Sequence, residues 1–271
     1  MRAVPSTTNT LSPLAQQRAK MQRPIFCRAV PSFFLALLIA LSTSAALALD
    51  IPAEHHPWGH FRAGSWVRHQ RTEFTTGADG KEQADRVTTT TTRLEEVRPD
   101  GVSLHIEIAV EGQPATTESR RYGWDGLEAD IERTIRLSVG EIKIAGKSFV
   151  CQTHEASVEQ PGRKSTNKWW YCPDQAPYLL KQIVRTTGGG PFSRSYEFTA
   201  LGTERDVLGR KLICDETQII ESNTDRASRT IQQTSFSVPG GVISEESQIR
   251  DKRRGQVGRT RLELEAYEIA E

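Results

Sequence analysis

The chain has 271 residues, with 35 Lys and Arg against 34 Asp and Glu, a formal net charge of +1 and 37% hydrophobic residues. Because the two signs of charge are interspersed along the sequence, we expect neither nucleic acid nor an anionic membrane surface as a partner. After residue 50 no apolar run approaches the length of roughly 20 residues that a membrane-spanning helix needs.

Residues 1–48 have the features of a secretory signal peptide. Basic residues precede an apolar run at 33–41, and small residues stand at −3 and −1 before a predicted cleavage point between Ala48 and Leu49. The protein is therefore expected to be secreted or periplasmic, with no stable membrane span after cleavage. Two alternatives remain open: initiation at Met21, which gives a signal of more ordinary length, and an uncleaved anchor.

We interpret residues 49–271 as one secreted β-rich domain. It begins with three closely spaced histidines, which invite a metal interpretation because neutral imidazole is the commonest metal ligand: His55, His56 and His60. A proline at position 57 breaks any helix that would align the last two, and no Cys or carboxylate pair completes a ligand set. We therefore expect no metal and no cofactor, and a segment held in place by the packing of Trp58 and Phe61.

The rest of the domain is predicted to be mainly β. Apolar and polar residues alternate over 102–110 and again over 261–266, the period of two that is typical of a strand with one buried face. Residues 122–138 fit either one short helix or two short strands. About ten or eleven strands, frequent turn signals and no βαβ rhythm predict an antiparallel sheet, curved or forming a half-barrel.

Two segments, at about 139–181 and 203–244, echo one another and predict an internal repeat. In each, a Gly-basic turn leads into a strand that carries a cysteine, Cys151 in the first segment and Cys214 in the second. A polar loop, a further strand, a Pro-containing turn and an apolar strand follow. The two prolines of the first segment stand between strands, where the missing N–H is tolerated.

The cysteines that follow the signal peptide are three in number, so one of them has no partner within the chain. Cys151 and Cys172 belong to neighbouring predicted strands, and a disulfide between them would leave Cys214 unpaired. The alternative is three small buried residues. A nucleophilic cysteine is disfavoured, because His154 lies three residues from Cys151 and so points to the opposite face of a strand.

Two adjacent tryptophans, Trp169 and Trp170, should point to opposite faces of their strand. One is expected in the core, and the other is either exposed or lines a concave ligand face. The sequence contains no nucleophile elbow, no metal-ligand spacing and no recognisable triad. We therefore predict no catalytic residues and a protein that is not an enzyme.

The segment from Trp169 to Lys181 resembles a hairpin of the lipoprotein-carrier (Lol-type) superfamily, in which an aromatic strand turns through a proline-containing loop into an apolar strand. The opening, His56-Pro57-Trp58-Gly59 followed by Gly64-Ser65-Trp66-Val67, is similar to a group of uncharacterised secreted planctomycete proteins. The resemblance implies a half-barrel whose concave face binds acyl chains or peptides, without catalytic residues. The internal echo and the absence of a clear lid helix depart from that family's pattern.

Two functions follow from these observations. The first is a non-catalytic binding module that holds a lipid, an acyl chain or a lipoprotein or peptide segment. The second is a structural or protein-interaction domain of the cell envelope, whose partner is an envelope protein and whose sheet has a filled core. Alternation shows that a face is apolar without showing what covers it, so the sequence leaves both functions open.

Overall fold

The computed structural model describes residues 51–76, 81–126, 134–253, 255 and 257–271. These residues form a mainly β structure in which the only helix is a short 3₁₀ turn, η1, at Ala53–His55. The strands are β1 Trp66–Thr76, β2 Glu82–Arg98, β3 Gly101–Val110, β4 Thr116–Gly123, β5 Thr134–Ile144, β6 Lys147–Gln160, β7 Arg163–Tyr171, β8 Leu179–Thr187, β9 Phe192–Val207, β10 Arg210–Asn223, β11 Arg226–Thr234, β12 Val242–Asp251 and β13 Val257–Glu268.

All of these strands belong to one antiparallel sheet, with the order β4-β3-β2-β1-β13-β12-β11-β10-β9-β8-β7-β6-β5. Short hairpins connect neighbours along most of the sheet, and β1 pairs with β13, so the first and last strands lie side by side. The predicted fold class, a mainly β chain with an antiparallel curved sheet, is confirmed. The described residues hold 13 strands, more than the ten or eleven predicted.

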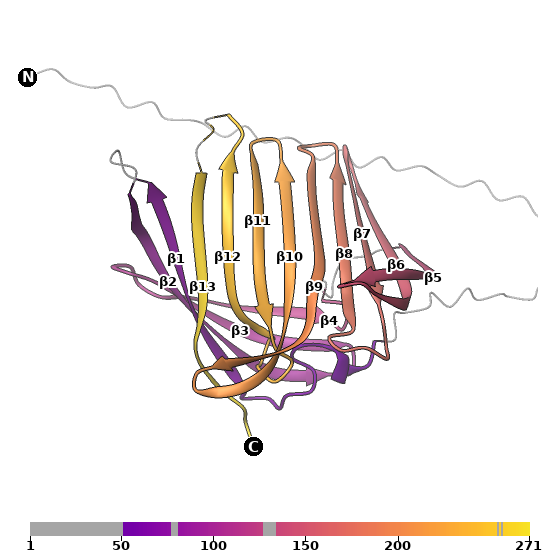
Figure 1. The fold of residues 1–271 in the computed structure, drawn as a ribbon, viewed down its shortest axis with the longest axis horizontal. Helices are drawn as coiled ribbons and strands as arrows, with labels where there is room; N and C mark the ends of the chain where they lie inside the picture. The colour runs from indigo at the N-terminus through magenta and orange to yellow at the C-terminus, as the bar shows by residue number, and fades with distance from the viewer. Residues whose placement is uncertain (1–50, 77–80, 127–133, 254, 256) are drawn as a thin grey trace, which may run out of the picture. The chain divides into compact units, whose positions relative to one another are not determined.

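The sheet curls, so that β3 and β4 pass behind the lower ends of β9 to β12 (Figure 1). A hydrophobic cluster fills the space that this curl encloses: Val102 and Leu104 of β3 pack with Val207 of β9 and with Cys214 of β10. Trp58 and Phe61 are buried in the same cluster, as predicted for the segment that precedes β1. Burial of such large rings holds this segment against the sheet.

The ambiguous segment at 122–138 does not begin or end as a helix. Its first residues complete β4, which ends at Gly123, and its last residues form the start of β5. The four-residue spacing of its apolar residues favoured a helix, but residues 122–123 pair with β3 and residues 134–138 pair with β6, so the described ends of the segment are strands. The part of the prediction at 127–133 lies outside the described residues.

The predicted signal peptide, with its cleavage point between Ala48 and Leu49, also lies outside the described residues. Among the residues that the structure does describe, no helix is long and apolar enough to cross a membrane.

Candidate functional site

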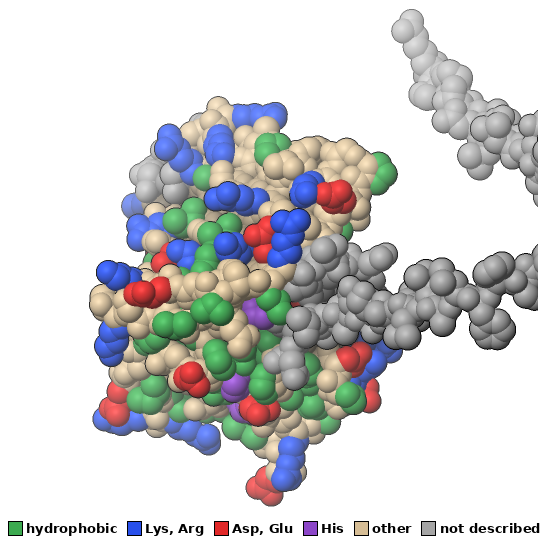
Figure 2. Space-filling model, turned by 90° about the vertical axis from the view of Figure 1, so that its right-hand side faces the viewer, with side chains coloured by type: hydrophobic (Ala, Val, Ile, Leu, Met, Phe, Trp, Pro, Cys, Tyr) green, Lys and Arg blue, Asp and Glu red, His purple; other side chains and the backbone are tan. Residues whose placement is uncertain are grey.

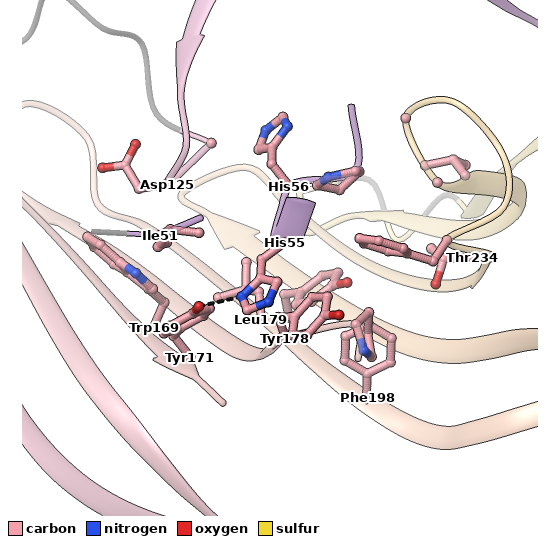
Figure 3. Close-up of a pocket in the computed structure, with 18 of the residues that line it drawn as sticks. Ile51, His55, His56, Asp125, Trp169, Tyr171, Tyr178, Leu179, Phe198 and Thr234 are labelled. Carbon is pink, nitrogen blue, oxygen red and sulfur yellow. Dashed lines mark hydrogen bonds between the residues drawn. The ribbon is translucent and has the colours of Figure 1, made fainter. Parts of the chain in front are cut away.

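A cavity of about 220 Å³ lies where the C-terminal ends of β7 and β11 and the segment 196–198 of β9 meet the N-terminal segment (Figure 3). Its lining is largely aromatic and aliphatic, with a few polar groups. The described residues that line it are Ile51, His55, His56, Pro57, Trp124, Asp125, Gly126, Trp169, Tyr171, Pro177, Tyr178, Leu179, Tyr196, Phe198, Gln232, Thr234, Ser235, Phe236, Gly240, Gly241 and Val242. Concave sites with mostly apolar walls and a few polar groups are the usual form of small-ligand sites.

One wall of the cavity is β7. Trp169 and Tyr171 are two residues apart in this strand, so their side chains share one face of the sheet, and both are buried. Trp169 pairs across the strands with His154 of β6, and the two rings stack with centroids 5.7 Å apart and planes inclined by 12°. This stack fixes the plane of the Trp169 indole at the edge of the cavity.

Several polar atoms in or behind the walls of the cavity are buried without a hydrogen-bond partner among the described residues. They include both ring nitrogens of His154 and Nε1 of Trp169, and Oγ1 of Thr234 shares this property in the wall formed by β11. Burial lowers the pKa of His154 to about 4, because the charged imidazolium loses its hydration there. The imidazole is therefore neutral at neutral pH.

Two loops with the same backbone hydrogen bonds form the floor of the cavity. In the loop after β7, the N–H of Cys172 donates to the carbonyl of Tyr178 over 2.7 Å. In the loop after β11, the N–H of Ser235 donates to the carbonyl of Gly241, also over 2.7 Å. Two further bonds within each loop recur at the same offset. The loops bring Tyr178 and Phe236 together edge to face, with centroids 5.5 Å apart.

The N-terminal segment crosses both loops. The His55 ring stacks on Tyr178 with centroids 3.6 Å apart, and His55 Nδ1 is hydrogen-bonded to the Tyr171 hydroxyl. Further along, His60 stacks on Phe236 with centroids 4.2 Å apart. Figure 3 shows His55 directed from η1 towards Tyr171 and Tyr178. Two of the three histidines that suggested a metal site, His55 and His60, are thus ring contacts to the two loops.

No group of three or more His, Cys, Asp or Glu side chains lies close enough to hold a metal ion within the described part of the chain. The third histidine, His56, is buried, and desolvation followed by the nearby His60 lowers its pKa to about 4. Its Nδ1 accepts the backbone N–H of Trp58 over 3.2 Å. An acceptor role of this kind supports the turn that seats the N-terminal segment.

The other face of β7 carries the disulfide. Cys151 of β6 is bonded to Cys172, with Cα atoms 4.4 Å apart, and Leu180 and Phe198 are buried in the same cluster. Trp170 packs against this cluster, with the ammonium of Lys168 5.2 Å from its ring centroid, and it does not line the cavity. The two adjacent tryptophans thus point to opposite faces, and only Trp169 reaches the candidate site.

Cys214 is the unpaired thiol among the described cysteines, and it is buried in the cluster that contains β3. Burial raises its pKa, which keeps it in the less reactive thiol form. His154 lies on the opposite face of β6 from the disulfide, as expected from their spacing. Neither Cys214 nor His154 therefore has the partners that an activated nucleophile needs.

Sequence reasoning missed most of the cavity lining. Tyr178 and Phe236 lie in the two echoed proline-containing turns, and that echo is the signal that could have directed attention to them. Phe198 and Ile51 carry no such signal, because their positions on the cavity depend on how β9 and the N-terminal segment are placed. A cavity built from segments far apart in sequence has no local pattern.

No family model matches the chain, and no curated protein matches it. Two solved structures are similar in part. One is a presumed exported protein with a YmcC-like fold from Bacteroides fragilis, 9% identical over 77% of this chain and 97% of that one, with a TM-score of 0.32. The other is a presumed lipoprotein from Parabacteroides distasonis, 12% identical over 76% and 96%, with a TM-score of 0.33. Because both TM-scores are below 0.5, neither similarity carries an argument about this chain.

Proposed function

We propose that this protein is a non-catalytic binding module that holds an apolar group in the aromatic cavity. The observation that carries the proposal is the cavity itself: about 220 Å³ with walls made by aromatic side chains from β7, β9, two loops and the N-terminal segment. Since a water molecule occupies roughly 30 Å³ of liquid, this volume corresponds to about seven waters. It suits a short apolar ligand, or the end of an acyl chain or one apolar side chain of a peptide.

The polar groups around the cavity support binding over catalysis. Ser235, His56 and Asp125 all line it, which is the set of residue types that an acyl-transfer triad uses. Ser235 Oγ accepts the backbone N–H of Ser237 over 3.4 Å, and no hydrogen bond among the described residues joins it to a histidine. A nucleophile needs a base within hydrogen-bond reach, so this arrangement supports a structural role for Ser235.

The experiment that tests the proposal is native mass spectrometry of the protein purified from its own source without detergent. We expect the native mass to exceed the denatured mass by a discrete amount that solvent extraction releases. A Thr234→Trp variant, which fills the cavity, should lose this added mass. A Thr199→Trp variant, which changes an exposed position on β9, should keep it. A native mass equal to the denatured mass would contradict the proposal.

That contrary result would favour the second function, a protein-interaction domain of the cell envelope. Three exposed apolar side chains on β5 and β6 support this alternative: Leu137, Val139 and Val150 are 47%, 74% and 72% exposed. On the side of the molecule shown in Figure 2, hydrophobic side chains lie scattered among charges of both signs rather than in one continuous patch. Export, as expected from residues 1–48, is part of both proposals.

A further inference from the structure

The sheet has two outer strands, and these differ in how their free edges are protected. β4 and β5 stand at the two ends of the strand order, so one edge of each pairs with no other strand in the described part of the chain (Figure 1). Unpaired N–H and C=O groups along such an edge are a template for pairing with another chain. Edge strands of natural proteins are therefore usually protected by charged side chains, proline or bulges.

β4 has this protection. It carries Glu118, Arg120 and Arg121 within eight residues, and the guanidinium of Arg120 lies 2.9 Å from the Glu118 carboxylate. None of the described side chains of β4 is both large, hydrophobic and exposed. A second chain that paired with β4 would have to remove water from these charges, which is unfavourable.

The middle of β5 lacks such protection. Val139, the central residue of this 11-residue strand, is 74% exposed, and Leu137 on the same face is also exposed. Val150 of β6, another exposed apolar side chain, pairs with Glu141 and so lies on this face as well. Residues 137–140 contain neither a charge nor a proline. An apolar edge of this kind predicts association with a further strand.

The residue order of β5 favours a second copy of the same chain as the partner. In an antiparallel strand pair with two-fold symmetry, residues that face one another lie on the same side of the sheet. The register that pairs all of β5 is centred on Val139, which then faces Val139 of the second copy, with Leu137 diagonally beside it. Each charged residue of the strand faces an uncharged one in this register: Arg136, Glu141 and Lys143 face Ile142, Leu137 and Ile135.

We propose that two copies of this protein associate through β5, in antiparallel register about Val139, so that their two sheets continue into one another. The pairing provides partners for the outer backbone groups of β5 and brings the apolar side chains of both copies together. Because only one end of the strand order offers such an edge, the assembly closes at two copies. This inference goes beyond both functions proposed above and does not depend on what the cavity holds.

The first measurement is sedimentation-velocity ultracentrifugation of the protein, purified without detergent, over a range of concentrations. We expect the wild-type protein to show a monomer–dimer equilibrium. Val139→Lys should raise the dimer dissociation constant by at least about tenfold, because it places two ammonium groups opposite one another. Ile220→Lys is the matched control: Ile220 is also exposed and apolar, but its strand is paired on both sides, so the dissociation constant should not change.

A cysteine at the central position tests the register. Val139→Cys should give a disulfide-linked dimer on mild oxidation, seen by electrophoresis without reductant, whereas Ile220→Cys should remain monomeric. The wild-type concentration series and this cross-link stand even where Val139→Lys fails to fold.

Three results would overturn the inference: a wild-type protein that is monomeric at every concentration, equal effects of the two lysine variants, or equal cross-linking of the two cysteine variants. Hydrogen exchange of the β5 amides then separates the causes in a monomeric protein. Slow exchange along the outer edge would show that another segment of the same chain covers it, and fast exchange that the edge stays open. Either result leaves the proposed cavity function intact, because native mass spectrometry tests that function separately.

Discussion

The buried histidine behind the cavity predicts a loss of stability in acid that one substitution should reduce. His154 is 2% exposed, and its pKa is lowered from 6.5 to about 4 by burial. The unfolded chain therefore binds a proton at this residue between pH 6.5 and pH 4, while the folded chain does not. The stability that the neutral ring contributes is complete above pH 6.5 and is lost as the pH falls towards 4.

The size of this effect follows from the pKa difference. At 1.36 kcal/mol for each pKa unit, a shift from 6.5 to about 4 corresponds to about 3 kcal/mol lost between pH 7 and pH 4. Replacing His154 by phenylalanine removes this titration and keeps a ring against Trp169. We therefore expect the stability difference between His154→Phe and wild type to shift in favour of the variant by about 3 kcal/mol as the pH is lowered.

The assay is urea unfolding followed by circular dichroism at a series of pH values from 7 to 4, with the unfolding free energy extrapolated to water. His56, whose pKa is also lowered to about 4, is present in both proteins and so contributes equally to both curves. Any packing change that the phenyl ring causes shifts the variant by the same amount at every pH. Parallel loss of stability in the two proteins would refute the reasoning, because His154 would then not titrate differently on folding.

Three further predictions concern the disulfide and the loops. A double variant, Cys151→Ala with Cys172→Ala, should lower the unfolding free energy by about 3 kcal/mol, as measured by denaturation, because the bond closes a loop of 21 residues; an unchanged midpoint would contradict this. Gly240→Ala should lower the thermal midpoint more than Gly209→Ala, since both have φ of 75° but only the first places a Cβ 2.9 Å from a tryptophan ring. Tyr178→Gly should weaken heptane binding in NMR titration, because it removes a ring from the cavity.

The strands were predictable because their signal is local. The alternation over 102–110 predicts β3, and the alternation over 261–266 lies within β13, since side chains in a strand change face at each residue. The segment at 122–138 was ambiguous for the same reason: its apolar residues fit a period of four as well as a strand. Only the pairing of its ends with β3 and β6 decides between them, and that pairing is not local.

Of the candidate site, the sequence could point to Trp169 as one of two candidates, but it could not predict the residues that surround Trp169. The adjacency of Trp169 and Trp170 shows that one of them faces each side, but not which side holds a cavity. That choice depends on which segments cover each face: the disulfide and Leu180 on one side, the N-terminal segment on the other. No periodicity within β7 carries this information. The sequence therefore predicts a pair of candidates, and the tertiary structure selects Trp169.

The two loops at the floor of the cavity differ in backbone conformation at one equivalent position. Tyr178 has φ of 68° and occupies the place that Gly241, with φ of 79°, takes in the second loop. A non-glycine residue in this left-handed region costs about 1 kcal/mol or more, and glycine meets the same hydrogen-bond pattern without that cost. The first loop instead places a tyrosine ring against His55, at the wall of the cavity. A glycine at that position could provide neither the stack on His55 nor this part of the cavity wall, so the left-handed conformation of Tyr178 places a ring that its counterpart loop lacks.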